Sequence, residues 1–525
     1  MTATITFTLD GREVAVRADG ASLLEALRDR IGSRSAKDGC SPQGQCGCCT
    51  VLVDGQARVA CVTPVARIAG RVVTTLEGMP ADVRDGWADA FSDTGASQCG
   101  FCTPGIVMRL AALASRPAAA GAAEPADAVD QALLAHLCRC TGWQTIHEAA
   151  ALVRDRTSHG ASVVVRPQRD LVAAGARATL EGASGQHVAR EVALGEGGFA
   201  DDSAPADALV AVLGLDGAWV VAETLTEARR LAGKVQGRRT TAPLSWPVSV
   251  PEGDWKRTLQ TTWVEPAYLE PDASWCVPGG QPASSLGNGG AFGGKVASSA
   301  AAMARQLADR HGRAVRVLFS REDVVRLGPK RPPMALGLRA DGSGIVRVAR
   351  TPGIAEAIAA VAPDVVVDQV DVLGPPTSAA IRAAGWAELA AASASLRPHG
   401  PDEVVAPNGS RASVSIASDG AVSVRVWAGE VLDAIVLRSY CIGAVHQAMG
   451  WVTSEAVSVD DAGRPLDLTI RSFGIVRAVD LPLVTVTIEA GEGPAINGSD
   501  AVFAASAAAF WRHRSFAARW PSTRS

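Results

Sequence analysis

Apolar and polar residues alternate at the start of the chain. The alternation runs through residues 5–9, stops at the turn dipeptide Asp10-Gly11, and resumes over residues 14–16. A period of two around an Asp-Gly pair predicts a β-hairpin. Residues 22–25 then have the spacing of a capped helix start, and residues 50–53 form a further strand pattern. The first part of the chain therefore predicts strands around a short helix.

From about residue 80 to 155 the pattern becomes helical. Residues 106–113 and residues 133–137 each place their large apolar side chains on one face of a helix. Cys99-x-x-Cys102 comes just before the first of these helices, and Cys138-x-Cys140 comes at the end of the second. Residues 115–128, rich in Pro and Ala, predict a loop between them.

The remainder of the chain contains two informative segments. Residues 217–235 predict a buried strand followed by an amphipathic helix that begins near Thr224. Residues 285–296 (SLGNGGAFGGKV) place five glycines around Phe292, a composition that excludes a core strand. Taken alone, this composition favours a flexible loop. Such a loop also allows backbone N–H groups to approach an anionic or oxo-bearing ligand closely.

Composition narrows the class of protein. A chain of 525 residues with 47% hydrophobic residues is long enough for several domains, and its net charge of −4 argues against a nucleic-acid partner. The first 20 residues lack the apolar core of a secretory signal, and no uninterrupted apolar run is long enough for a membrane span. We therefore expect a cytoplasmic protein, in which clustered cysteines are metal ligands more often than disulfides.

Nine of the eleven cysteines lie in the first 140 residues, and eight of them form two sets. The first set is Cys40, Cys46, Cys49 and Cys61, and the second is Cys99, Cys102, Cys138 and Cys140. Two sets of four thiols are what two iron–sulfur clusters require. A structural zinc site and a disulfide framework are the alternatives, and both are disfavoured. For Cys48, a small buried residue is favoured over a ligand.

Residues 39–61, 98–108 and 137–143 closely resemble the two-cluster domain of the xanthine dehydrogenase/aldehyde oxidase family of molybdenum hydroxylases. The resemblance implies two [2Fe-2S] clusters, one in a plant-type ferredoxin fold and one in a small four-helix domain. It also implies that Gln98 and Cys140 lie against the pterin of the molybdenum cofactor. The loop from Cys40 to Cys46 is one residue longer than is usual in the family.

The glycine-rich segment resembles the molybdopterin-binding motif of the same family, whose Phe-Gly backbone faces the oxo ligand of the metal. The cofactor-binding residues it implies are Gly289, Gly290, Ala291, Phe292, Gly293 and Gly294, followed by Lys295. Residues 269–271, 320–323, 330–331, 442–467 and 479–510 match further family segments in the same order. Arg382 resembles the family's arginine near the substrate pocket, and a surface arginine on an Ala-rich helix is equally compatible.

The family's chemistry needs a carboxylate near the metal as a general base, with a pKa raised by burial. When residues 479–510 are aligned with the family's C-terminal lobe without a gap, this role falls to Glu492. A second alignment of the same segment assigns it to Asp500. An exposed turn carboxylate is the alternative interpretation of Glu492. The residues after Glu265 are far fewer than the family's molybdenum-binding lobes contain, and no flavin-domain segment or cysteine-bearing loop of the carbon monoxide dehydrogenase subfamily is present.

The sequence therefore predicts an α+β multidomain fold. The expected units are a β-grasp ferredoxin domain at 1–78, a helical cluster domain at 79–160, a linker and reduced strand–helix domain at 161–260, and a shortened mixed α/β molybdopterin-binding domain at 261–525. The favoured function is a molybdenum hydroxylase chain that oxidises an aldehyde or N-heterocycle, with the cofactor in dinucleotide form. Its expected partners are a small-molecule substrate, a flavin subunit or other electron acceptor, and a further molybdenum-binding subunit. A non-catalytic electron-transfer subunit is the alternative.

Overall fold

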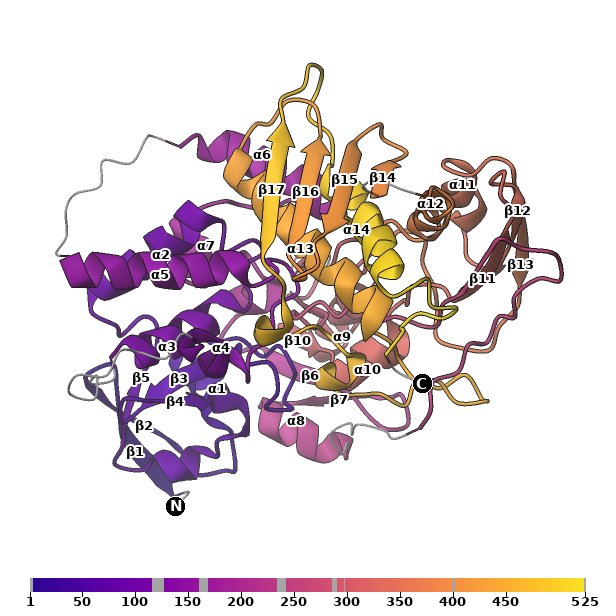
Figure 1. Cartoon of the computed structure of the whole chain (residues 1–525). Helices are drawn as coiled ribbons and strands as arrows, with labels where there is room; N and C mark the ends of the chain where they lie inside the picture. Colours follow the sequence, from indigo (N-terminus) through magenta and orange to yellow (C-terminus); the bar gives the residue numbers. More distant parts are fainter. Residues whose placement is uncertain are drawn as a thin grey trace.

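The computed structural model describes residues 3–115, 127–159, 169–233, 242–285, 290–296, 298–398 and 402–523. These residues form four sheets with helices between and around them (Figure 1). None of the helices in these ranges is both long and apolar enough to cross a bilayer. The expected Pro/Ala loop at 115–128 lies almost wholly outside the described residues.

The hairpin predicted from the alternation is present. Strands β1 and β2 pair antiparallel, and Leu9 faces Arg12 across the Asp10-Gly11 turn. They belong to a mixed sheet with the order β2 (Arg12–Arg17), β1 (Thr4–Leu9), β5 (Val72–Thr74), β3 (Thr50–Val53) and β4 (Gln56–Val59). The hydroxyl of Ser22 accepts a hydrogen bond from the Glu25 amide at 3.2 Å, as the capping pattern predicts. Helix α1 (Leu23–Glu25) continues as the π-helix η1 (Ala26–Ile31), and the short 3-10 helices η2 (Ala60–Val62) and η3 (Val65–Ile68) follow.

Helices α2 (Ala81–Thr94), α3 (Thr103–Ala114), α4 (Ala128–Leu133) and α5 (Gln144–His159) follow the sheet. Helix α2 lies along α5, and α3 packs on α4 and on the sheet (Figure 1). The expectation that Cys138 and Cys140 end a helix is wrong, because α4 ends at Leu133. After Leu133 the chain is no longer helical, because the Leu137 amide donates its hydrogen bond to the Cys46 carbonyl oxygen at 3.0 Å.

The next part of the chain builds a second sheet. After α6 (Leu171–Gly182), α7 (Arg190–Ala193) and η4 (Ala200–Ser203), the strand order is β7 (Trp219–Ala222), β6 (Leu209–Leu213), β10 (Val315–Leu318) and β9 (Ala273–Cys276). Helices α8 (Leu225–Ala232), α9 (Ala300–His311) and α10 (Arg321–Leu327) belong to the same region. The strand–helix pair expected at 217–235 is β7 and α8, with Thr224 as the helix cap. Strand β7 is half-buried rather than buried because it is the edge of the sheet.

Two further sheets build the C-terminal half. One has the order β13 (Val365–Val370), β12 (Gly344–Ala349), β11 (Met334–Leu338) and β8 (Arg257–Gln260), and the other has β14 (Asp402–Val405), β15 (Arg411–Ile416), β16 (Val422–Trp427) and β17 (Val484–Glu489). The helical segments are α11 (Ile354–Ala359), α12 (Trp386–Ser395), α13 (Ala434–Thr453), η5 (Ile470–Phe473), η6 (Ala478–Asp480) and α14 (Ser499–His513). Helices α13 and α14 pack against each other, and the alanines of α14 allow this close approach.

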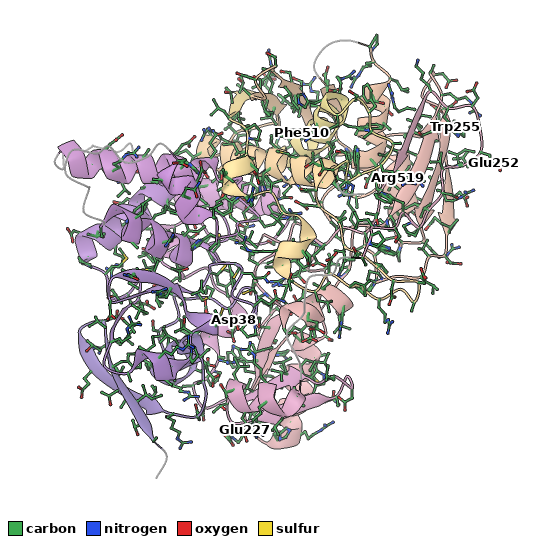
Figure 2. All side chains as sticks on the ribbon, turned by 60° about the horizontal axis from the view of Figure 1, so that its bottom comes forward. Asp38, Glu227, Glu252, Trp255, Phe510 and Arg519 are labelled. Atoms are coloured by element: carbon green, nitrogen blue, oxygen red, sulfur yellow. The ribbon has the colours of Figure 1, made fainter. Side chains whose placement is uncertain are left out.

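A network of ion pairs joins the N-terminal sheet region to the rest of the chain. The buried Arg28 guanidinium pairs with Asp201 and Asp202, each at 2.8 Å. Although burial opposes it, Arg316 and Arg28 hold the pKa of Asp201 at about 2. Arg229 of α8 pairs with Asp38 at 3.0 Å, and Figure 2 shows Asp38 where the two parts of the chain meet. These pairs fix the orientation of the cysteine-bearing loops.

Replacing Arg28 by Ala would remove the cation that two mostly buried aspartates share, leaving Asp201 with Arg316 and Asp202 with Lys37. We expect Arg28→Ala to lower the free energy of unfolding by about 2–3 kcal/mol in urea denaturation. The matched control is Arg71→Ala, because the Arg71–Asp54 pair is exposed, and it should cost less than about 1 kcal/mol. Equal losses in the two variants would contradict the role given to this network.

Candidate functional site

The first cysteine set is held by the loop before β3 and by η2. Its four buried thiols are Cys40, Cys46, Cys49 and Cys61. Backbone amides point at the sulfurs: Gln43 N and Gln45 N donate to Cys40 Sγ at 3.2 and 3.4 Å, and Cys61 N donates to Cys49 Sγ at 3.4 Å. Hydrogen bonds from the thiols of Cys46 and Cys61 hold the pKa of Cys40 well below its ordinary value. The same hydrogen bonds, together with burial, raise the pKa of Cys46 and of Cys61, so the set holds Cys40 as the thiolate, the form that binds metal.

The extra residue of the Cys40–Cys46 loop does not separate these thiols. The Gln43 side chain donates to the Leu468 carbonyl oxygen at 2.8 Å and accepts from the Ile470 amide at 3.2 Å. The longer loop therefore reaches the C-terminal half of the chain and is fixed there, while the four sulfurs stay together.

The second set lies around the start of α3 and the connection from α4 to α5. Its buried thiols are Cys99, Cys102, Cys138 and Cys140. Cys140 Sγ donates to Cys99 Sγ at 3.5 Å. Hydrogen bonds from the thiols of Cys102 and Cys140 hold the pKa of Cys138 well below its ordinary value, and the Thr141 hydroxyl lies 3.2 Å from its sulfur.

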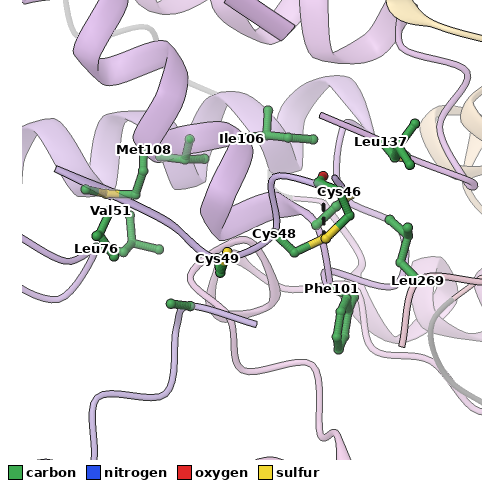
Figure 3. Close-up of a cluster of buried hydrophobic side chains, with 14 of the residues drawn as sticks. Cys46, Cys48, Cys49, Val51, Leu76, Phe101, Ile106, Met108, Leu137 and Leu269 are labelled. Atoms are coloured by element: carbon green, nitrogen blue, oxygen red, sulfur yellow. Dashed lines mark hydrogen bonds between the residues drawn. The ribbon is translucent and has the colours of Figure 1, made fainter. Parts of the chain in front are cut away.

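The two sets share one hydrophobic core, in which Phe101, from the loop between Cys99 and Cys102, lies near Cys46 and Cys48 (Figure 3). A Cβ atom on Gly105 would lie 2.3 Å from the Gly47 carbonyl oxygen, so α3 approaches the first loop as closely as glycine allows. In the described residues no three His, Cys, Asp or Glu side chains converge to hold one metal ion. A [2Fe-2S] cluster divides its four thiolates between two irons and does not need that convergence.

The glycine-rich loop lies directly against the second set. A Cβ atom on Gly290 would lie 2.2 Å from Cys140 Sγ, and the φ of Gly290 is +69°. On the other side of the loop, the Arg382 amide donates to the Phe292 carbonyl oxygen at 2.8 Å, and Gly293 packs against the Ala380 carbonyl. Gly289 lies outside the described residues. The loop thus joins a cysteine of the second set to the segment that carries Arg382.

Phe292 and Arg382 line a cavity that opens to solvent and holds about 390 Å³ of empty space, the open part included. Arg382 is buried in a loop before α12, so it is not a surface arginine on a helix. Its Nε donates to Asp500 at 2.9 Å and its Nη2 donates to Ser499 at 2.6 Å. Its buried Nη1 has no hydrogen-bond partner among the described residues. Its guanidinium lies 4.5 Å from the centre of the Phe292 ring.

Neither candidate general base lines this cavity. Glu492 lies on an exposed turn after β17, and Asp500 is occupied by its ion pair with Arg382. Burial raises the pKa of Asp500, although Arg382 opposes the shift. The carboxylates in the lining are Glu265, which pairs with Lys330 at 2.8 Å, and Glu455.

Glu455 and its partner Arg139 were not singled out by the sequence. The Arg139 guanidinium donates to both carboxylate oxygens of Glu455, at 2.6 and 2.8 Å. Gln447 donates to the Arg139 carbonyl oxygen at 2.9 Å. Arg139 lies between two cysteines of the second set, and this position is the one signal that could have pointed to it. The pairing itself joins residues more than three hundred positions apart, and no local pattern reveals it.

Gln98 and Cys140 lie next to each other. Gln98 Nε2 donates to the Cys140 carbonyl oxygen at 3.2 Å and to the Ser439 hydroxyl at 2.9 Å, while its buried Oε1 has no partner in the described part of the chain. Gln98 lines a second cavity of about 380 Å³, which also contains Tyr440. The Tyr440 and Phe292 rings lie 6.1 Å apart between the two cavities. The orphaned acceptor of Gln98 and donor of Arg382 fit a pterin, which carries both donors and acceptors.

Comparison with known families gives two matches in the N-terminal part. Residues 7–66 match the 2Fe-2S iron–sulfur cluster binding domain, and residues 75–151 match the [2Fe-2S] binding domain. The iron–sulfur-binding subunit of xanthine dehydrogenase from Escherichia coli O157:H7 is 39% identical over 149 residues, which are 28% of this chain and 90% of that protein. The chain belongs to the xanthine dehydrogenase/aldehyde oxidase family of molybdenum hydroxylases.

Other members of the family match a similar share of this chain. The small FeS subunit of nicotinate dehydrogenase from Eubacterium barkeri is 33% identical over 159 residues, which are 30% of this chain and 98% of that protein. Aldehyde oxidoreductase from Megalodesulfovibrio gigas is 34% identical over 157 residues, which are 28% of this chain and 17% of that protein. The expectation of a molybdenum-dependent oxidoreductase of this type is confirmed.

The fold of the whole chain is similar to a solved structure. Aldehyde oxidoreductase from Desulfovibrio gigas aligns with a TM-score of 0.72 and 14% identity, covering 99% of both chains. At this identity the likeness shows the fold alone. The expected α+β multidomain fold with [2Fe-2S] domains is therefore confirmed in its coarse form.

The contact between the glycine-rich loop and the second set can be tested with a matched pair of variants. Gly290→Ala would place a Cβ 2.2 Å from Cys140 Sγ, whereas Gly279→Ala, at a nearly identical φ of +70°, meets no atom within 4 Å. We expect Gly290→Ala to perturb the electron paramagnetic resonance signal of the second cluster and leave that of the first unchanged. Gly279→Ala should leave both signals unchanged. An unperturbed second cluster in Gly290→Ala would contradict this contact.

Proposed function

We propose that this chain is the iron–sulfur-bearing chain of a molybdenum hydroxylase that oxidises an aldehyde or an N-heterocycle with oxygen derived from water. Electrons would pass through two [2Fe-2S] clusters to a separate flavin subunit or another acceptor. One observation carries the proposal. The cavity beside Phe292, the glycine-rich loop, Cys140 and both cysteine sets form an unbroken series of contacts.

Named residues would hold each group. The first set would bind one cluster in the domain proposed at 1–78, and the second set would bind the other in the domain proposed at 79–160, where α2 to α5 would form the four-helix unit. Each [2Fe-2S] cluster, when bound, accepts and releases one electron at a time. The polar groups of Gln98 and Arg382 and the backbone of residues 290–294 would orient the pterin. Residues 161–260 would link the two halves, and residues 261–525 would form the shortened cofactor-binding domain.

When bound, the molybdenum cofactor supplies the two-electron oxidation of substrate. The chain would contribute the shape and polarity of the cavity. Arg382 is fixed by Asp500 and Ser499 and keeps one N–H group free for a ligand, while the apolar ring of Phe292 covers the other side of the guanidinium. The two pockets hold about 390 and 380 Å³ of empty space, part of it open solvent, which is small for a dinucleotide form of the cofactor, so a partner subunit would complete the cradle.

The state of the carboxylates around the cavity beside Phe292 favours a second function. Within the described lining of the cavity, Glu265 and Glu455 are both tied in ion pairs, and Glu492 lies outside it. A general base must lie within hydrogen-bond reach of the proton it accepts, and a carboxylate held by a cation is a weaker base. The alternative is therefore a non-catalytic electron-transfer subunit with a degenerate molybdenum lobe. Two relatives are named as subunits, which supports separate partners for this chain as well. For either function we propose a cytoplasmic location.

Metal analysis of the anaerobically purified protein, co-expressed with its neighbouring subunits, separates these functions. The hydroxylase predicts about four iron atoms per chain and stoichiometric molybdenum with pterin. The electron-transfer subunit predicts the same iron without molybdenum. A colourless protein with zinc would contradict both, because four-thiolate zinc sites do not absorb visible light.

The role of the two candidate acids can be tested on the assembled complex. We expect Asp500→Asn to lower kcat about tenfold or more, because Asp500 fixes the cavity arginine Arg382. Glu492→Gln removes an exposed carboxylate outside the cavity and should change kcat less than about twofold. The measurement is the rate of cluster reduction by substrate in stopped-flow spectroscopy. If Glu492→Gln abolished reduction while Asp500→Asn did not, Glu492 would be the base and this assignment would be wrong.

A further inference from the structure

Arg321 differs from the other buried arginines of the chain. Among the described residues seven arginines are buried. Arg321 is one of them, and 0% of its surface is exposed. The other six each pair with a carboxylate: Arg28, Arg139, Arg177, Arg316, Arg331 and Arg382. Arg321 has no carboxylate within 4 Å in the described part of the chain. The buried lysines there do not share this feature, because Lys37, Lys295 and Lys330 are all ion-paired.

The partners of Arg321 are backbone carbonyls. Its Nη2 donates to the Gly39 oxygen at 2.6 Å and to the Leu269 oxygen at 2.8 Å. Its Nε and Nη1 have no hydrogen-bond partner in the described residues. A guanidinium stays charged inside a protein, so burial without a counter-charge is strongly unfavourable. An anion close to Arg321 would remove this penalty.

Both carbonyl partners lie against the first cysteine set. Gly39 directly precedes Cys40, and a Cβ atom on Gly39 would lie 3.1 Å from Cys46 Sγ. Leu269 lies in the same core as Cys46 and Phe101 (Figure 3). The guanidinium is thus one peptide unit away from the place where four thiolates gather. A [2Fe-2S] cluster bound by four thiolates carries net negative charge, and its reduction adds one electron and one more negative charge.

We propose that Arg321 is the counter-charge of the first cluster and sets its reduction potential. The inference rests on the proposed function in assuming that the first set holds a [2Fe-2S] cluster. The redox step is the transfer of one electron into that cluster from the second cluster or from an added reductant, and no bond breaks. A fixed positive charge stabilises the reduced form more than the oxidised form. Arg321 therefore raises the potential of the first cluster and draws electrons away from the second.

A redox titration of the wild-type protein and of Arg321→Gln, followed by electron paramagnetic resonance, tests this role. At the wild-type midpoint of the first cluster, the ratio of reduced to oxidised cluster is expected to fall about tenfold in the variant, a shift of about 59 mV to more negative potential. The second cluster is the internal control, and its shift should be clearly smaller.

Two further variants separate charge from structure. Arg58→Gln removes an exposed arginine of the same sheet region, whose guanidinium donates to the Gln56 side-chain amide oxygen, and solvent screening should leave both midpoints unchanged. Arg321→Lys keeps the charge and should keep the first midpoint near the wild-type value. If Arg321→Gln loses the first cluster while Arg321→Lys retains it, the role as counter-charge is supported.

Two results would overturn the inference. One is an unchanged first midpoint in Arg321→Gln, and the other is loss of the first cluster in both Arg321 variants, which would indicate a purely structural residue. These outcomes differ from failure of the proposed function. In that case the wild-type protein itself would contain no iron, whatever stands at position 321.

Discussion

Eight thiols buried in one continuous core impose the main constraint on this protein. Thiolates are costly to bury unless metal, hydrogen bonds or cations compensate their charge. The chain supplies backbone amides to Cys40 and Cys49 and places an unpaired guanidinium beside the first loop. The close approach of Gly105 to Gly47 brings the two sets into one core. The positions of the surrounding helices follow from this requirement.

The C-terminal half continues the same chain of contacts. Gly290 packs on Cys140, and the loop that contains it is bonded through Phe292 to the Arg382 segment. The cavity there is walled by arginines whose charges are already balanced by Glu455, Glu388 and Asp500. A wall of satisfied ion pairs is rigid and holds the few free donors and acceptors in place. Under the proposed function this arrangement would position a ligand, and proton transfer would fall to a group outside the described lining or on a partner.

Local patterns in the sequence predicted what depends on local chemistry. The hairpin around Asp10-Gly11 and the cap at Thr224 follow from turn and capping preferences, and the structure confirms them. The end of α4 was missed because a long-range bond from Leu137 to Cys46 decides it. Pairs such as Arg139 with Glu455 leave no local trace, since each partner alone has the pattern of an ordinary polar residue. The cysteine spacing identified the family, whereas the sequence left open whether Glu492 is a buried base or an exposed turn carboxylate, and the structure places it on the exposed turn.

The most direct test of this account is electron paramagnetic resonance of the anaerobically purified, dithionite-reduced protein. The structure predicts two distinct [2Fe-2S] signals of equal intensity, split by magnetic interaction because the two cysteine sets share one core. A single signal, two signals without any interaction, or a protein without iron would contradict it.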